Sequence, residues 1–213
     1  MVALAAEKLM TKIRPMADRE KYLHAFGMVS SYQKQVMQFI EERLGYEARL
    51  ELGSVWQAAI TAIRKDYPDV RKYEAAYCNW EWMARSSHDF LADVLVREDV
   101  ADYKRLLLSR YSQQHDNPGI PIMRLFRNHV ALARMWAYEM QWITPIELTS
   151  LSKEKVVCTV HACKLLQTPA TERICRVDCR NVGAALLLKV YHLKRVDAIA
   201  DHGCTITLSP LDN

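Results

Sequence analysis

The most regular feature of the chain is the spacing of apolar residues in its first two thirds. From Ala17 to Leu44 these residues recur at intervals of three and four with Lys and Glu between them, which is the period of an amphipathic helix. The apolar positions of this segment are Tyr22, Phe26, Val29, Val36, Phe39 and Ile40. The pattern predicts one long helix that ends near Gly45.

Further helices follow the same period. They are expected at Ser54–Tyr67, Asp69–Arg97, Asp99–Gln114 and Pro121–Trp142. Pro68 ends the first of them, because proline disfavours helical geometry in the residue before it, and Asp69 is placed to cap the next. The run from His115 to Gly119 interrupts the period with Asp, Asn, Pro and Gly, which indicates a loop.

In its last third the chain changes to short apolar runs separated by polar turns. Lys155–Cys163 is rich in β-branched residues, and Gly203–Leu208 alternates apolar with polar side chains, so both predict strands. Val182–Lys194 has helical spacing. We therefore expect an α+β fold, with a helical N-terminal layer packed on a small C-terminal sheet with a long helix. Residues 1–145 would form the helical region and 146–213 a cysteine-rich α/β segment, together one compact domain.

Composition and charge narrow the classes of function. The chain has 213 residues, half of them hydrophobic and a quarter charged, as in globular proteins. Its formal charge of +4 is dispersed, so it lacks the positive stripe that nucleic-acid binding requires. No stretch approaches the roughly 20 apolar residues of a membrane-spanning helix, and the start of the chain is too charged for a signal peptide. We expect a cytoplasmic protein without nucleic-acid or membrane partners.

The distribution of cysteine is the strongest indication of chemistry. Five of the six cysteines lie in the last third of the chain: Cys158, Cys163, Cys175, Cys179 and Cys204. In a reducing compartment such cysteines are mostly free thiols, which serve catalysis, metal binding or core packing.

His161 and Cys163 should share one face of the first predicted strand, because side chains alternate along a strand. An imidazole close to a thiol lowers its pKa and so produces the nucleophilic thiolate. In the alternative interpretation, Cys163 ends the strand as a small buried hydrophobe.

Cys175 and Cys179 are four residues apart and therefore lie one turn from each other on a helix. Cys175 is nearer the expected helix start, where the dipole favours a thiolate. Cys179 continues an apolar stripe with Val182 and Leu186, which favours packing. Cys204 belongs to the apolar face of the last strand and follows a polar turn that would place it at the mouth of the strand.

Zinc or iron is a minority alternative for these residues. His161, Cys163, Cys175 and Cys204 are of the types that bind both metals, but they lack the paired Cys-x2-Cys spacing of structural zinc sites. Phosphate-binding loops, dinucleotide fingerprints, serine nucleophile elbows and zinc-protease motifs do not occur in the sequence. We expect no cofactor and no metal.

Parts of the tail resemble a known family. The shared elements are Cys163, then Cys175-Arg-Val-Asp178 entering a helix, and finally Ile199–Leu208 with Cys204 after a turn. Together they resemble the 2-amino-thiazoline-4-carboxylate hydrolase-like family, which is distantly similar to ligand-binding domains of the 4-vinyl reductase type. The resemblance implies a small α+β domain with an enclosed pocket and, in the best-known members, hydrolytic opening of a sulfur-containing five-membered ring.

With this resemblance, we expect a cysteine-dependent enzyme of small-molecule metabolism or biosynthesis. It would hydrolyse or rearrange a C=N or carbonyl centre in a small heterocycle, with one of three pocket cysteines as nucleophile and a neighbouring group moving protons. The expected site residues are the catalytic Cys163, Cys175, Cys204, Asp178 and His161, and the substrate-binding Trp136 and Tyr138.

Two other classes of function stay open. The chain could be a non-catalytic sensor domain that binds a small ligand or a metal, or a helical interaction protein whose cysteines only pack. The amphipathic helix at Ala17–Leu44 also leaves a homodimer open.

Overall fold

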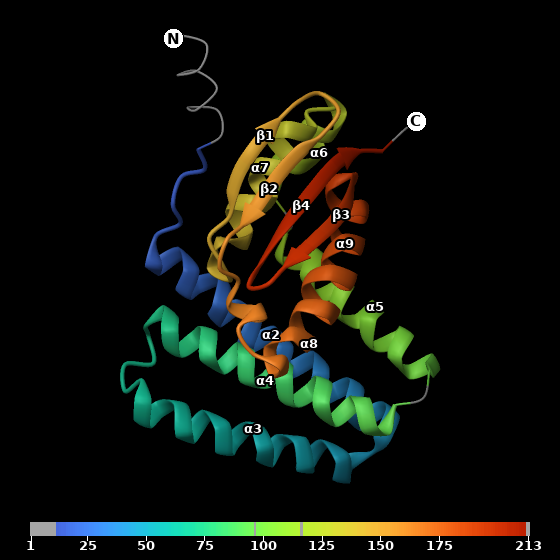
Figure 1. Cartoon of the computed structure of the whole chain (residues 1–213). Helices are drawn as coiled ribbons and strands as arrows, with labels where there is room; N and C mark the ends of the chain where they lie inside the picture. The colour runs from blue at the N-terminus through green and yellow to red at the C-terminus, as the bar shows by residue number, and fades with distance from the viewer. Residues whose placement is uncertain (1–11, 96, 116, 212–213) are drawn as a thin grey trace.

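The computed structural model describes residues 12–95, 97–115 and 117–211. Four long helices come first: α2 (Asp18–Leu44), α3 (Tyr46–Asp66), α4 (Tyr73–Val94) and α5 (Arg97–Gln114). Figure 1 shows α2, α3 and α4 stacked at one end of the molecule and the sheet at the other. The first predicted helix is confirmed almost to the residue, and Val36, Phe39 and Ile40 are buried as predicted. Phe26, predicted on the apolar face, is exposed, and Ala25 and Met28 are buried in the N-terminal half of the helix.

The start of α4 differs from the prediction. Its N-cap is Lys72, whose side chain makes no capping hydrogen bond. Asp69 accepts a hydrogen bond from the backbone N–H of Arg71 at 3.1 Å, so it stabilises the preceding turn. The predicted capping role of Asp69 is wrong, because three further residues, 70–72, lie between Asp69 and the first residue of the helix, Tyr73.

The single helix predicted over 121–142 is also wrong. The structure has α6 (Gly119–Leu125), α7 (His129–Glu139) and a 3-10 turn, η1 (Met140–Trp142). Arg127 has a positive φ of 51°, which no helix accommodates. The Asn128 side chain accepts a hydrogen bond from the backbone N–H of Ala131 at 3.0 Å and so starts a new helix.

The sheet has four antiparallel strands in the order β1-β2-β4-β3. Their bounds are β1 (Glu147–Leu151), β2 (Val156–Val160), β3 (Leu193–Ala200) and β4 (Gly203–Pro210). The α+β fold with an N-terminal helical layer is thus confirmed. Sequence analysis missed β1 and β3, because both are edge strands whose side chains are mostly exposed and show no apolar alternation.

One continuous helical segment connects β2 to β3. It consists of α8 (Pro169–Ile174), the π-helical η3 (Cys175–Val182), α9 (Gly183–Leu186) and the π-helical η4 (Leu187–Tyr191). Thr168 caps its start by accepting a hydrogen bond from the backbone N–H of Thr171, and Pro169 occupies the first turn. The segment ends at His192, whose φ of 54° is left-handed. It therefore begins well before the predicted Val182.

Gly203 is required where β4 starts. A Cβ on this residue would lie 2.3 Å from the carbonyl oxygen of Val160 on β2, closer than a carbon atom can approach without moving the backbone. The missing side chain lets β4 pair tightly with β2, so that Cys204 lies opposite Val160 on one side and Ile199 on the other.

Apolar side chains from the helices and the sheet form one connected core. Its large, fully buried members include Tyr32, Ile40, Leu52, Trp56, Trp80, Trp136 and Leu148. Within the residues described, no helix is both long enough and apolar enough to cross a membrane.

Candidate functional site

Two adjoining cavities lie between the helical layer, the π-helical segment and the sheet. We call the first the sulfur cavity, lined by Cys163, Cys175, Cys179, Cys204 and Asp197 among others. We call the second the aromatic cavity, lined by Trp80, Tyr111, His115, Trp142 and Asp178 among others. The two share a wall of Trp136, Met140, Ile143, Leu165, Cys179 and Arg195. Their volumes, about 20 and 40 Å³, suit water-sized molecules or one small ligand.

The structure brings together the three cysteines that the sequence singled out. Cys163 follows β2, Cys175 begins η3, and Cys204 lies on β4, yet all three line the sulfur cavity. Cys179, for which the pattern favoured core packing, lies on the wall shared by both cavities. All four are free thiols.

Arg195 is the group that distinguishes Cys179 from the other cysteines. Its Nη2 lies 3.4 Å from the Cys179 sulfur, and its Nη1 donates a hydrogen bond to the Cys179 carbonyl oxygen at 2.7 Å. Its Nε donates to Asp197 at 2.7 Å, and its side chain is only 2% exposed. A buried guanidinium is therefore fixed against one sulfur atom by three separate contacts.

These contacts make Cys179 the acidic thiol of the group. A hydrogen bond from the Cys175 thiol lowers the pKa of Cys179, burial opposes this shift, and the charge of Arg195 lowers the pKa further. The same hydrogen bond and burial raise the pKa of Cys175. Burial raises the pKa of Cys204 to about 12 and raises that of Cys163 as well. At neutral pH we expect Cys179 as the thiolate and its three neighbours as thiols.

The position of Cys175 corrects the argument that favoured it from the sequence. Cys175 lies six residues after Pro169, inside the continuous helical segment and not at its start. The positive end of the helix dipole therefore does not act on its sulfur, because that effect is confined to the first turn.

Asp178 is buried and held by two partners. One carboxylate oxygen lies 2.5 Å from His88 Nε2, and the other accepts a hydrogen bond from the Tyr111 hydroxyl at 2.6 Å. Burial alone would raise the pKa of Asp178, but the charge of His88 and the hydrogen bonds of His88 and Tyr111 outweigh it and lower the pKa. With both oxygens occupied, Asp178 is a fixed carboxylate and a poor carrier of protons.

His161 lies away from both cavities. β2 ends at Val160, so strand alternation does not continue to His161 and Cys163, and the prediction that they share a strand face is wrong. The imidazole is exposed and lies 3.1 Å from the carboxylate of Glu147. Cys163 instead turns inward, with its backbone N–H donating to the His202 carbonyl oxygen at 2.7 Å.

His115 is a site residue that sequence reasoning missed. Its Nδ1 contacts the Glu139 carboxylate and lies 2.9 Å from the Tyr191 hydroxyl, which itself donates to Glu139 at 2.6 Å. The ring lines the aromatic cavity, and its Nε2 makes no hydrogen bond to any residue that the structure describes. A carboxylate at Nδ1 with an open Nε2 is the arrangement of an oriented acid–base histidine.

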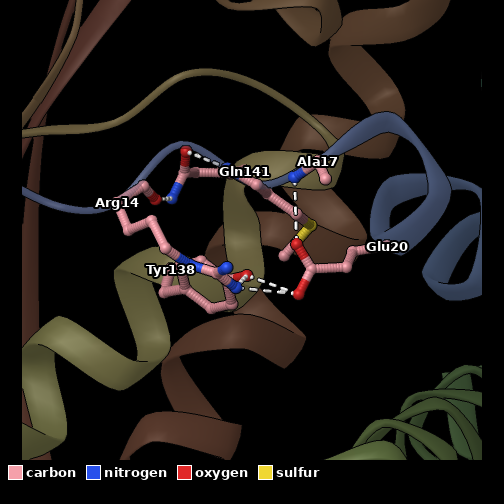
Figure 2. Close-up of polar contacts among 6 residues, drawn as sticks. Arg14, Ala17, Glu20, Tyr138 and Gln141 are labelled. Carbon is pink, nitrogen blue, oxygen red and sulfur yellow. Dashed lines mark hydrogen bonds and ion pairs between the residues drawn. The ribbon is translucent and has the colours of Figure 1, made fainter.

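The two predicted substrate-binding aromatics have different surroundings. Trp136 is buried and lines both cavities. Tyr138 lines neither; Figure 2 shows its hydroxyl in a polar cluster with Arg14 and Glu20. Arg14 Nη2 donates to this hydroxyl at 2.5 Å, and the hydroxyl donates to Glu20 at 2.9 Å. Tyr138 thus ties the segment before α2 to α7, and the structure does not place it against a ligand.

Within the described part of the chain, no three His, Cys, Asp or Glu side chains are placed so as to hold a metal ion. The four sulfur-cavity cysteines therefore do not form a preorganised zinc or iron site among the described residues.

Comparisons with known proteins find no protein-family model that matches the chain and no curated protein that matches it. The resemblance to the thiazoline hydrolase-like family stays a prediction from the residues of the tail.

Proposed function

We propose that this protein is a cysteine-dependent enzyme that acts on a small molecule, with Cys179 as the nucleophile. The observation that carries the proposal is the Cys179 sulfur beside the buried guanidinium of Arg195, on the wall of two cavities. A thiol becomes a useful nucleophile only as the thiolate, and a fixed cation stabilises that form at neutral pH.

The proposed reaction begins with attack of the Cys179 thiolate on the carbon of a C=N or carbonyl group. A carbon–sulfur bond forms, and the electron pair of the double bond moves to nitrogen or oxygen, which takes a proton. The tetrahedral adduct then collapses: the bond from this carbon to a second heteroatom of the substrate breaks, the C=N or C=O bond re-forms with loss of the proton just taken, and the departing heteroatom takes up that proton. Water attacks the carbon of the resulting thioimidate or thioester, the carbon–sulfur bond breaks, and the thiolate is restored. His115, oriented by Glu139 and Tyr191, supplies and removes these protons from the aromatic cavity.

The cavities indicate the kind of substrate. Trp80, Trp136 and Trp142 provide flat apolar walls, which favour a planar ring. The volumes of about 40 and 20 Å³ exclude large substrates without movement of side chains. With the resemblance of the tail, this supports a small sulfur-containing heterocycle, in secondary metabolism or a related biosynthetic route. Reactive free thiols also favour a reducing compartment such as the cytoplasm.

The experiment is hydrolysis of 2-amino-thiazoline-4-carboxylate and related small cyclic amidines by the purified protein and by Cys179→Ser. We expect turnover in the wild type, loss of turnover in Cys179→Ser and full turnover in Cys78→Ser, a control thiol on α4 that lines neither cavity. Equal turnover in Cys179→Ser would overturn the proposal.

A ligand-binding sensor is the second candidate, favoured by one observation. Polar side chains that line the two cavities are already fixed by hydrogen bonds, Asp178 and His115 in the aromatic cavity and Arg195 in the wall that both share, as in preformed binding pockets. In that case a planar ligand would raise the melting temperature of wild type and Cys179→Ser equally, without being consumed.

A further inference from the structure

The sulfur cavity contains more thiol chemistry than one nucleophile requires. Hydrolysis through Cys179 uses a single sulfur, yet Cys163, Cys175 and Cys204 line the same cavity. We propose that Cys179 and Cys175 form a dithiol pair that reduces a small hydroperoxide and ends as a disulfide. The inference rests on the reactive Cys179 thiolate of the proposed function, and adds a second activity to it.

The helix geometry selects Cys175 as the partner. Cys175 and Cys179 are one turn apart on η3, and both line the sulfur cavity. Side chains four apart on a helix have Cβ atoms about 5–6 Å apart, whereas a disulfide requires about 4 Å. A disulfide between Cys175 and Cys179 therefore requires a small local shift of η3.

The surroundings of Cys179 suit a peroxide. The Arg195 guanidinium, 3.4 Å from the sulfur, has donors that can hold both oxygen atoms of a peroxide beside the thiolate. Hydrogen peroxide is close to water in size, so it fits cavities of about 20 and 40 Å³. A hydroperoxide with a bulky organic group would require movement of the Trp136 wall.

The reaction proceeds in two balanced steps. The Cys179 thiolate attacks one peroxide oxygen; a sulfur–oxygen bond forms, the oxygen–oxygen bond breaks, and the departing hydroxide takes a proton from solvent to become water. The Cys175 sulfur then attacks the Cys179 sulfenic acid; a sulfur–sulfur bond forms, and hydroxide leaves with the Cys175 proton as a second water. The thiol pair loses two electrons and the peroxide gains them. An external dithiol restores the reduced pair.

The other two cavity cysteines are weaker partners for Cys179. Neither lies on η3, whereas Cys175 lies one helical turn from Cys179 on the same segment. Cys163 immediately precedes a 3-10 turn, and Cys204 lies on the inner strand β4, which pairs with a strand on each side. Either would need movement of a different element to reach Cys179.

The sequence provides a direct readout of the disulfide. Arg173, Arg176 and Arg180 flank the two cysteines, so trypsin separates Ile174-Cys175-Arg176 from Val177-Asp178-Cys179-Arg180. The reduced full-length protein is treated with equimolar hydrogen peroxide, its free thiols are blocked with iodoacetamide, and the digest is analysed by mass spectrometry. We expect the two peptides to appear joined, and to separate after dithiothreitol.

Variants test each step without any heterocyclic substrate. Cys175→Ser keeps a hydrogen-bond donor but cannot close the disulfide, so Cys179 should accumulate as a sulfenic acid that dimedone traps. Cys179→Ser should give neither product, and Cys78→Ser should behave like the wild type. We expect hydrogen peroxide to oxidise Cys179 at least about tenfold faster than Cys78. Hydrogen peroxide should also oxidise Cys179 faster than cumene hydroperoxide does, because the small cavities exclude the bulky organic group.

Several results would overturn the inference: a peroxide-induced disulfide from Cys179 to Cys163 or Cys204, the same thiol loss in Cys175→Ser as in the wild type, or no oxidation of Cys179.

Alkylation of Cys179 by iodoacetamide separates a failure of this inference from a failure of the proposed function. If iodoacetamide modifies Cys179 rapidly while peroxide does not oxidise it, only the peroxide activity is refuted. If Cys179 resists both reagents, the thiolate itself is refuted, and both proposals are overturned with it.

Discussion

Asp178 and Cys179 are neighbours in the chain, but they belong to two buried polar groups of different character. The carboxylate network consists of His88, Tyr111 and Asp178, and both carboxylate oxygens have partners. The thiol site consists of Cys175, Cys179 and Arg195; Cys179 lines both cavities, whereas Asp178 lines only the aromatic cavity. A buried ion with hydrogen-bond partners at all of its polar atoms contributes to the stability of the fold. A buried ion that has a partner on one side and a cavity on the other can still react with a ligand.

The largest expected effect is on turnover, in His115→Gln. His115 belongs to neither group but lines the aromatic cavity that both adjoin, so it tests whether the chemistry extends beyond the thiol site. Loss of an oriented acid–base group should lower kcat by about 10²–10⁴, with the alkylation rate of Cys179 unchanged. Unchanged kcat would restrict the chemistry to the thiol site.

The carboxylate network should respond in stability. Asp178→Ala leaves His88 and the Tyr111 hydroxyl buried without their partner, and should lower the free energy of unfolding by about 3–5 kcal/mol. Urea denaturation measures this loss. Asp89→Ala is the matched control: Asp89 lies beside His88 on α4 and pairs with Arg173 at the surface, so its loss should cost about 0–1 kcal/mol. Equal losses of unfolding free energy in Asp178→Ala and Asp89→Ala would show that the buried carboxylate network stabilises the fold no more than a surface ion pair does.

The same network predicts a pH dependence. Because the folded pKa of Asp178 is lowered, its contribution to stability is present above the unfolded aspartate pKa of about 3.9 and is lost as pH falls through the folded pKa. The difference in unfolding free energy between the wild type and Asp178→Ala should therefore shrink on acidification. A difference that stays constant with pH would exclude the ionised carboxylate as its source.

A smaller effect is expected at the thiol site, in Arg195→Met. Loss of the guanidinium should raise the pKa of Cys179 and slow its alkylation at neutral pH by about tenfold or more. Arg195→Lys should recover part of the rate, because it restores the charge without the fork of donors. Arg176→Met, an exposed arginine on the same helical segment, is the control and should leave the rate unchanged.

The part of this arrangement that sequence could predict follows from local pattern. Periodicity predicted α2, and alternation predicted β4 with Cys204 on it, because both elements have one buried face. The concentration of cysteine in the tail directed attention to the segment where the sulfur cavity forms. These features depend on residues that are close together in the chain.

The rest depends on contacts between distant residues. Arg195 went unnoticed because β3 is an exposed edge strand without an apolar pattern, although Arg195 and Asp197 share one face of it two residues apart. His115 was assigned to a loop by its Asp, Asn, Pro and Gly neighbours; its partners Glu139 and Tyr191 are 24 and 76 residues away. Neither the contacts of Arg195 nor those of His115 produce a recognisable pattern within one stretch of sequence.

The central claim is that Cys179 is a thiolate because of where Arg195 and Cys175 lie. Its most direct test is the rate of iodoacetamide modification at each cysteine as a function of pH, read by mass spectrometry of the full-length protein. We predict that the rate at Cys179 reaches its plateau below the ordinary cysteine pKa of about 8.5, while the rate at Cys78, whose pKa is raised by burial, is still rising there. Parallel profiles at Cys179 and Cys78 would contradict the account.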